Sequence, residues 1–453
     1  MTSDSKIIFL LLPTGMTIRN FLTTRIVENI LEKSSHKIIC CLRNPEKYQN
    51  YYTHPRLEYI AFHEKKTANL SNLFLLILRR RFYSINQNPT LKILEKGPLF
   101  LNLKQKLTSL LKYPFPKSKK LYGFIKALNH WTYKYNKKIQ EQFSEFKPDI
   151  VFATHLVAKD EYDYLMIAQA KHVPTIGMVK SFDNLTSKGY LPFETDQVIV
   201  WNSIMEKEIL SLYNYDEENI HVTGVPQFDL YKEPPKKSKD EFFKKNGLDK
   251  QKKVILYATN HEDISPDDPK NIQFIAKKLK QYNAQLIVRL HQMDRLDRYQ
   301  SSPYDDVHFQ VPGINQGKDS NERVAERKFL EELRDTIFYS DLTINTASTM
   351  SLDAVTMDKP VINIAFDFFD KPYHQSVKRY YDFVHYQPII ESSATSIATT
   401  KIELLKYIEI YLSNAAIKKQ EREIMREIML HGHKGNAAMN VADTLLYSLE
   451  KNR

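Results

Sequence analysis

The chain has 453 residues, of which 42% are hydrophobic and 26% are charged. This length exceeds what one hydrophobic core usually serves, so we expect two domains, and the composition excludes a largely disordered protein. No stretch approaches the roughly 20 apolar residues that span a bilayer, and the first apolar run is too short for a signal peptide, which predicts a cytoplasmic protein. Its two cysteines, Cys40 and Cys41, are adjacent on a predicted strand and point to opposite faces, so no disulfide is expected.

The formal net charge of +11 comes from one segment, 65–138, which holds 17 lysines and arginines against a single acid, Glu95. The segment also contains the apolar run 73–78 and many aromatic residues. This combination suits an anionic membrane surface or an anionic acceptor, because each Lys or Arg near such a surface contributes about 1 kcal/mol. One alternative is a solvated helical insert. Another is nucleic acid, which we do not expect because no nucleic-acid motif accompanies the charge.

Strand-like runs alternate with helix-like runs on both sides of this segment, which predicts parallel sheets in α/β layers. The first domain is expected over 1–231, with the basic segment as a largely helical insert. Expected helices are 20–33 and 203–213, and expected strands are 6–12, 37–42, 57–62, 150–154, 175–178, 197–201 and 220–223.

The segment 232–253 contains paired prolines, dense charge and a glycine, and we expect it to be a linker with one short helix inside it. A second domain is expected over 254–400, followed by C-terminal helices over 401–453. The fold class is therefore α/β, with two Rossmann-like domains facing a cleft and ligands beyond the carboxyl ends of the strands. The expected elements are strands 254–259, 285–290, 307–311, 342–345 and 360–364, and helices 271–282, 325–339, 349–356 and 417–429.

The strand predicted over 342–345 ends in a run of hydroxyl residues, and a helix follows at once. Hydroxyl groups at a helix start cap its free amide groups, and the same amides attract anions. Thr346, Ser348, Thr349 and Ser351 are therefore candidates for holding a diphosphate. The alternative is N-capping without a ligand.

This order of strand, hydroxyl loop, helix, Lys359-Pro360 and strand resembles the donor half of GT-B glycosyltransferases. It is especially similar to bacterial CDP-glycerol glycerophosphotransferase-like and surface-polysaccharide transferases. The resemblance implies that the hydroxyl loop meets the donor phosphates and that Asp353 lies near the ribose. The run Gly224–Asp229 (GVPQFD) is similar to the G-x-P-x-x-D run that closes the first domain of such enzymes.

Arg289 and His291 stand at the end of the predicted strand 285–290. The same transferases place a His-Pro pair here, with the His facing the donor phosphate. This sequence has His291-Gln292 and so lacks the rigid turn that proline imposes. The resemblance implies that His291 neutralises charge on the leaving phosphate, helped by Arg289 on the same strand face. The alternative is a surface histidine at a strand end.

The loop after the strand 254–259 carries Asn260, His261, Glu262 and Asp263. In GT-B enzymes this loop borders the cleft, which makes Asn260 and His261 candidate donor contacts. His261, Glu262 and Asp263 could together bind a metal ion, but such a run is common by chance. The sequence also has no Asp-x-Asp motif. We therefore expect no metal and no separate cofactor.

The segment 179–189 (VKSFDNLTSKG) occupies the place of a loop that carries the general base in glycerophosphotransferase-like enzymes. The resemblance implies this role for Asp183. The alternative is an Asx-turn, in which Asp183 and Asn184 bond their own backbone. His155 and Asp160 are the competing bases.

Acceptor contacts are expected near the first strand, where Thr14, Gly15 and Arg19 form the usual acceptor-side loop of this fold, and at Asn184 beside the base. The partners are then a nucleotide-sugar donor and a glycan or lipid-linked acceptor. An anionic membrane surface is a further expected partner, through 65–138.

The expected activity is that of an inverting, metal-independent glycosyltransferase, which moves a sugar or polyol phosphate from a nucleotide donor to a hydroxyl of a surface glycan or lipid-linked acceptor. We expect it in the cytoplasm, peripheral to the inner face of the membrane if the basic segment binds lipid. One alternative is a nucleotide-sugar 2-epimerase-like enzyme, which needs an acid–base pair around the sugar and no acceptor site. Another is a non-catalytic membrane- or glycan-binding scaffold.

Overall fold

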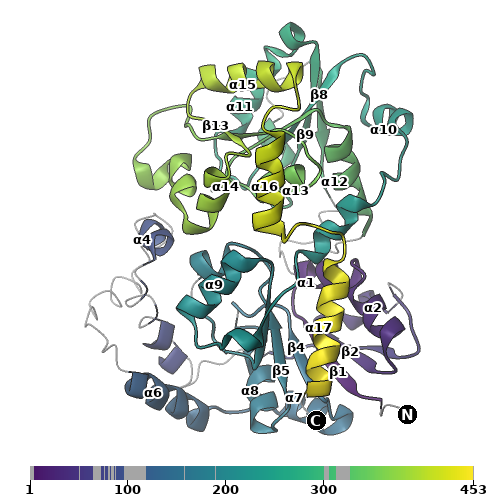
Figure 1. Cartoon of the computed structure of the whole chain (residues 1–453), viewed down its shortest axis with the longest axis vertical. Helices are drawn as coiled ribbons and strands as arrows, with labels where there is room; N and C mark the ends of the chain where they lie inside the picture. Colours follow the sequence, from purple (N-terminus) through teal and green to yellow (C-terminus); the bar gives the residue numbers. More distant parts are fainter. Residues whose placement is uncertain are drawn as a thin grey trace. The chain divides into compact units, whose positions relative to one another are not determined.

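The computed structural model divides the chain into two compact units (Figure 1). The first comprises Met1–Gln227 together with Asn436–Arg453, and the second comprises Phe228–Gly435. The structure describes residues 5–49, 52–64, 73–75, 77–79, 82, 86, 88–95, 119–157, 159–188, 190–299, 306–312 and 327–451.

The first unit is built on a parallel sheet with the strand order β3-β2-β1-β4-β5-β6-β7. Its central strands are continuous apolar runs buried on both faces, as is typical of parallel sheets covered by helices. The strands are β1 (Ile7–Leu12), β2 (Lys37–Leu42), β3 (Leu57–Ala61), β4 (Ile150–Ala153), β5 (Thr175–Met178), β6 (Gln197–Val200) and β7 (Ile220–Val222).

One helix was expected after β1, and the structure has two. The hydroxyl groups of Thr23 and Thr24 donate to the carbonyls of Arg19 and Asn20 over 2.6 and 2.7 Å, so they compete with the helical backbone bonds at this point. The helices of this unit are α1 (Gly15–Leu22), α2 (Ile26–Lys33), α4 (Pro89–Glu95), α6 (Lys119–Thr132), α7 (Lys137–Phe146), α8 (Tyr162–Ala170), α9 (Ser203–Leu212) and α17 (Ala437–Lys451).

The last helix of the chain, α17, packs within the first unit, where it lies beside α2 (Figure 1). Lys33 forms an ion pair with Asp443 at 2.5 Å, and the Ser448 hydroxyl donates to Gln197 Oε1 over 2.6 Å. The residues 401–453, which the sequence groups together, are thus shared between the two units.

The second unit is built on a parallel sheet with the order β10-β9-β8-β11-β12-β13. Its strands are β8 (Lys253–Ala258), β9 (Ala284–Arg289), β10 (Val307–Gln310), β11 (Leu342–Asn345), β12 (Val361–Ile364) and β13 (Ser396–Ala398). Its helices are α10 (Lys239–Asn246), α11 (Asp268–Ala276), α12 (Arg327–Tyr339), α13 (Met350–Thr356), α14 (Gln387–Glu391), α15 (Lys401–Ser413) and α16 (Lys419–Leu430).

The expected linker 232–253 contains the short helix α10, and this helix packs within the second unit. Ser238 and Glu241 form a capping box at its start, and Gly247 ends it with a φ of +67°. Phe242 is buried and stacks on Tyr339 with ring centroids 4.9 Å apart. The second unit begins at Phe228, so it includes the expected linker as well as β8.

The two parallel α/β sheets are confirmed, and each expected strand lies within one residue of its expected bounds. The three-residue strand β13 is an addition, because a segment this short carries little periodic signal. No helix among the described ranges has the length and apolar character needed to cross a membrane.

Candidate functional site

In the second unit the strand order reverses between β8 and β11, which is where ligands of such sheets bind beyond the strand ends. Two adjacent residues after β8 tie the neighbouring loops together. The Thr259 hydroxyl accepts from the His291 amide over 2.9 Å, and Asn260 Nδ2 donates to the Thr346 carbonyl over 2.8 Å. Candidate donor residues after β8, β9 and β11 are thereby brought together.

A buried carboxylate, Asp268 at the start of α11, holds the loop after β8 in place. It accepts from the Asn260 amide over 2.8 Å, from the Ser265 hydroxyl over 2.6 Å and from the Tyr257 hydroxyl over 2.7 Å. Burial raises the pKa of Asp268 to about 6. The position of Asn260 therefore depends on a carboxylate that still ionises at neutral pH.

The exposed His291 begins a tight turn after β9. Its Nδ1 accepts from the Met293 amide over 3.2 Å, which assigns the ring proton to Nε2. The turn thus leaves His291 with a ring N–H donor at Nε2, the kind of group that a phosphate oxygen accepts from.

Asp294, in the same turn, connects His291 to the core of the second unit. Its Oδ2 accepts from Thr259 over 2.7 Å and from Tyr299 over 2.5 Å, and it forms an ion pair with Arg298. Burial alone would raise the pKa of Asp294, but these hydrogen bonds hold it below its usual value. Asp294 is therefore an anion that fixes Thr259, which in turn fixes the His291 backbone.

The hydroxyl loop lies between β11 and α13. Ala347 adopts a φ of 39°, a left-handed conformation that is unusual for a residue with a side chain. The Ser348 hydroxyl accepts from the backbone amide two residues later over 3.3 Å, and Thr349, the N-cap of α13, makes no side-chain capping bond. Thr346 is buried, with its carbonyl bonded to Asn260.

Ser351 and Asp353 are both buried, as is almost all of the seven-residue helix α13. The Ser351 hydroxyl donates to Asn345 Oδ1 over 3.2 Å and accepts from Asn363 Nδ2 over 2.9 Å. Asp353 accepts from the hydroxyl of Tyr231. The structure thus shows both side chains in contacts that hold α13 against its neighbours.

Arg289 and His261 are engaged within the second unit. Arg289 is buried and donates to Gln310 Oε1 over 3.1 Å and to the Phe329 carbonyl over 3.4 Å, and burial lowers the pKa of its guanidinium. His261 Nδ1 lies 3.3 Å from both the backbone amide and the carboxylate of Asp263. These contacts orient the strand end and the loop after β8.

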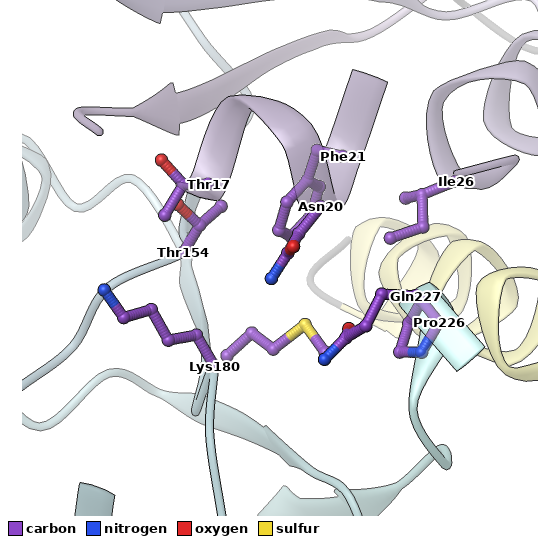
Figure 2. A pocket seen from close by; sticks show the side chains of 9 residues that line it. Thr17, Asn20, Phe21, Ile26, Thr154, Lys180, Pro226 and Gln227 are labelled. Atoms are coloured by element: carbon purple, nitrogen blue, oxygen red, sulfur yellow. The ribbon is translucent and has the colours of Figure 1, made fainter. Parts of the chain in front are cut away.

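The first unit contains a pocket of about 260 Å³ beyond the carboxyl ends of β1, β4 and β5 (Figure 2). The strand order reverses between β1 and β4, so the pocket occupies the switch point of this sheet. In Figure 2 the amide groups of Asn20 and Gln227 are directed into this space, and the Lys180 side chain extends along it. The polar lining residues are Thr17, Asn20, Thr154, Lys180 and Gln227.

Asp183, the expected base, lies between β5 and a π-helical turn, Asn184–Lys188. Its Oδ1 accepts from Ser181 over 2.5 Å and from Asn184 over 3.1 Å, and its Oδ2 accepts from Ser187 over 2.8 Å. These three donors are side-chain groups, whereas the Asx-turn alternative calls for backbone amides, and they hold a half-buried carboxylate in one orientation. Asn184 Oδ1 is buried with no hydrogen-bond partner among the described residues.

The two competing bases differ in their surroundings. Burial, with the positive charges of Lys180 and Lys188, lowers the pKa of His155 to about 3. Its Nδ1 is buried and unpartnered within the described part of the chain. Asp160 lies 3.6 Å from the Arg43 guanidinium, and burial raises its pKa above the usual value.

The acceptor-side residues Thr14 and Gly15 start α1. Thr14 forms a capping box with Thr17, which is itself a pocket residue. Arg19 Nε donates to Asn20 Oδ1 over 3.2 Å, so the Asn20 amide group is turned with its Nδ2 toward the pocket. The expected acceptor loop and the pocket therefore share one helix.

Several residues of these sites were not predicted from the sequence. Lys180 lies inside the segment 179–189, in which the predicted site residues were Asp183 and Asn184. Burial lowers the pKa of Lys180 to about 8. Glu161 is fully buried, accepts from the Thr154 and His155 amides over 2.7 and 2.8 Å, and has a pKa that burial raises to about 8. No sequence pattern distinguishes such a buried carboxylate from an exposed one.

The basic insert is described in part, and most of the segment on which the membrane prediction rests, Arg80 and Arg81 included, lies outside the described residues. Asn88 Nδ2 donates to the Thr186 carbonyl over 3.1 Å, which joins the insert to the turn that follows Asp183. Helix α6 exposes 60% of Phe124 and 82% of Trp131.

Solved structures with the same fold cover nearly the whole chain. A glycosyltransferase from Rickettsia africae has a TM-score of 0.54 at 11% identity, with 99% of each chain covered. The UDP-GlcNAc 2-epimerase from Neisseria meningitidis, bound to UDP-GlcNAc, has a TM-score of 0.52 at 14% identity, covering 98% of this chain and 100% of its own. A variant of the wall teichoic acid polymerase TagF has a TM-score of 0.50 at 13% identity, covering 100% and 90%.

Likeness at this level of identity shows the GT-B-type fold alone. No curated protein matches the chain. The family model described as CDP-Glycerol:Poly(glycerophosphate) glycerophosphotransferase matches residues 150–447, about two thirds of the sequence. This match includes both the Asp183 turn and the loops after β8, β9 and β11. The chain therefore belongs to the CDP-glycerol:poly(glycerophosphate) glycerophosphotransferase family, and it is a nucleotide-donor transferase that acts on cell-surface polymers.

Proposed function

We propose that the chain transfers glycerol phosphate, or a closely related polyol-phosphate group, from a cytidine diphosphate donor to a hydroxyl group of an anionic surface polymer or its lipid-linked precursor. The observation that carries this proposal is the pair of bonds at Thr259 and Asn260. They assemble His291 and the hydroxyl loop at the switch point of the second sheet. A family model that names CDP-glycerol covers the same loops.

The second unit supplies hydrogen-bond donors at the place where negative charge develops on the leaving phosphate. The acceptor oxygen attacks the phosphorus that carries the glycerol, and the bond from that phosphorus to the CMP oxygen breaks. His291 Nε2–H and the Ser348 hydroxyl donate to the departing phosphate oxygens. The leaving group is CMP, and the transferred group gains a phosphodiester bond to the acceptor.

The first unit supplies the base. Asp183 takes the proton of the attacking hydroxyl, and its bonds to Ser181, Asn184 and Ser187 keep one carboxylate orientation for that task. The displacement is a single in-line step, which inverts the reacting centre, and hydrogen-bond donors of the chain take the place of a metal. Retained activity in the presence of a chelator tests the last point.

We also propose that the protein works at the cytoplasmic face of the membrane, because the insert combines a strong basic excess with exposed aromatic side chains. A 2-epimerase remains distinguishable by its product. The epimerase structures share the fold with this chain, whereas the matched family model is that of a transferase.

Isothermal titration of the full chain against CMP, CDP, UDP and GDP tests the proposal. We expect CDP to bind most tightly, at least tenfold better than UDP and GDP. Preference for UDP, together with formation of a 2-epimer from a UDP-sugar, would support the epimerase. Binding of none of the four would indicate a non-catalytic scaffold.

A further inference from the structure

We infer that the pocket of the first unit binds the phosphate-bearing polyol end of the acceptor, with Lys180 as the cationic contact and the amides of Asn20 and Gln227 as hydrogen-bond donors. The inference rests on the proposed function for the identity of the acceptor. The binding itself is a property of the first unit, because the lining residues of the pocket all belong to it.

Three polar groups that line the pocket have no partner among the residues that the structure describes. Among the described residues, Lys180 Nζ has neither an ion pair nor a hydrogen bond, although it is half-buried. The Gln227 amide and Asn20 Nδ2 likewise have none in the described part of the chain, while Asn20 Oδ1 accepts from Arg19. Asn20 is buried and Lys180 and Gln227 are half-buried, so all three offer N–H donors to a ligand that enters the pocket.

The hydroxyl groups in the same wall, unlike the three groups above, donate hydrogen bonds within the protein. Thr17 donates to the Thr14 carbonyl over 2.8 Å, and Thr154 donates to the Leu11 carbonyl over 2.6 Å. Their donor capacity is used inside the protein, and they shape the wall. The groups left for a ligand are then an ammonium group and two amides, which present N–H donors to oxygen atoms.

The charge around the pocket favours an anion. Burial lowers the pKa of His155, which lies beside the pocket. The positive charges of Lys180 and Lys188 lower this pKa further. Of the acids that face Lys180, Glu161 is protonated for the most part at neutral pH, because burial raises its pKa to about 8, and Asp160 is paired with Arg43. The third, Asp183, accepts hydrogen bonds from Ser181, Asn184 and Ser187. A phosphate oxygen beside Lys180 therefore meets an ammonium group without an ion-pair partner among the described residues.

The apolar part of the pocket lining also bears on the ligand. Phe21 and Met178 give the remaining wall an apolar surface, which suits the carbon atoms of a polyol. The ammonium group, the two amides and this apolar surface together point to a polyol phosphate.

Competitive acylation tests this directly and needs no turnover. The full chain is treated with a trace of acetic anhydride at pH 7.5, and acetylation of Lys180 is measured by mass spectrometry relative to the exposed Lys207 in the same digest. We expect saturating glycerol 3-phosphate to slow acetylation of Lys180 at least fivefold and to leave Lys207 unchanged. Glycerol and CDP should give no protection, and inorganic phosphate should give less than glycerol 3-phosphate.

Three variants sharpen the result. Lys180→Met should weaken glycerol 3-phosphate binding at least tenfold in a titration, Lys180→Arg should restore most of it, and the matched control Lys207→Met should not change it. Equal protection by CDP, or protection by none of these probes, would overturn the inference. Protection by inorganic phosphate alone would reduce the site to a general anion site and would also overturn it.

Failure of the proposed function has a different signature. If the wild-type chain binds no nucleotide but Lys180 is protected by glycerol 3-phosphate, the transferase proposal fails and the pocket stands. If CDP binds normally and Lys180 is not protected, the pocket assignment fails and the donor site stands.

Discussion

Asn260 and Thr346 are joined across the switch point of the second sheet, where Asn260 Nδ2 donates to the Thr346 carbonyl over 2.8 Å. Both residues are buried, with exposures of 8% and 2%. Loss of the donor would leave a buried carbonyl unpaired, which typically costs about 1–3 kcal/mol. The hydroxyl loop after β11 and the loop after β8 therefore keep one relative position.

Asn260→Ala should weaken CDP binding about tenfold or more, equivalent to about 1.4 kcal/mol. The hydroxyl loop then loses the hydrogen bond that joins it to the loop after β8. The nucleotide must therefore order the donor groups of the hydroxyl loop when it binds. Isothermal titration measures the change, and circular dichroism checks that the fold is intact. Gln281→Ala, at an exposed site in the same unit, is the control and should bind CDP normally. Unchanged affinity in Asn260→Ala would remove this bond from the donor site.

His291→Ala and Ser348→Ala should each weaken binding of a nucleotide mono- or diphosphate at least about tenfold, because each removes a donor to phosphate. Both side chains stand at element ends, so we expect the fold to survive. His291→Gln keeps an N–H donor near the position of Nε2 and should recover part of the loss. If titration gives wild-type affinity for both alanine variants, the donor site lies elsewhere.

The sequence predicted the sheets well because parallel strands buried on both faces are continuous apolar runs. It also located Asn260, His291, Thr346 and Ser348 at strand ends that the topology brings to one edge of the sheet. It did not reveal which side chains turn inward, because that depends on packing between distant segments. The bond between Asp353 and Tyr231 spans 122 positions and has no local signal.

The pocket residues show the same limit. Asn20, Lys180 and Gln227 follow three different strands and meet through the order of the sheet. From the sequence alone, a lysine in a polar loop is expected to be a solvated charge. Its partial burial and its lack of an ion pair among the described residues become visible when the three segments are placed together.

Binding of glycerol 3-phosphate should weaken as the pH rises through about 8. Burial lowers the pKa of Lys180 to about 8 and raises that of Glu161 to about 8, so above this pH the lysine loses a positive charge and the glutamate gains a negative one. Both changes disfavour an anion, so the affinity should be highest near pH 7 and fall at least tenfold by pH 9.5. The charged groups around Lys180 are Glu161, Asp183, Asp160 and Lys188.

Titration calorimetry at pH 7.0, 8.0, 9.0 and 9.5 measures this profile. In Lys180→Arg the positive charge persists throughout this range, so the decline should shrink to the part due to Glu161. A flat profile in the wild-type chain would be at odds with a role for Lys180 in binding.

The basic insert should bind vesicles that contain acidic phospholipid and should not bind neutral ones. Binding should fall with added salt, because the Debye length shrinks from about 10 Å at 0.1 M to about 3 Å at 1 M. Changing the three arginines at 79–81 to serine should lower vesicle affinity by about two orders of magnitude, at about 1 kcal/mol for each charge. Trp131→Ser should lower it further, because this side chain is 82% exposed.

Co-sedimentation measures the affinity, and activity on a short soluble acceptor should be spared in these variants. The matched control changes Lys244, Lys277 and Lys280 of the second unit to serine and should leave vesicle binding unchanged. Vesicle binding that is absent or insensitive to salt would make the insert a solvated helical surface.

Acceptor-dependent release of CMP, measured by chromatography for the wild-type chain and for Asp183→Asn, is the direct test of glycerol phosphate transfer with Asp183 as the base. With CDP-glycerol and a short glycerol phosphate oligomer, the wild-type chain should release CMP and lengthen the oligomer by one unit for each CMP. Asp183→Asn keeps most of the local hydrogen bonds but cannot take a proton, so its turnover should fall by roughly 10²- to 10⁴-fold with CDP affinity nearly intact. Comparable turnover in the variant would move the base to His155 or Asp160, and a wild-type chain that binds CDP but never lengthens the acceptor would contradict the account.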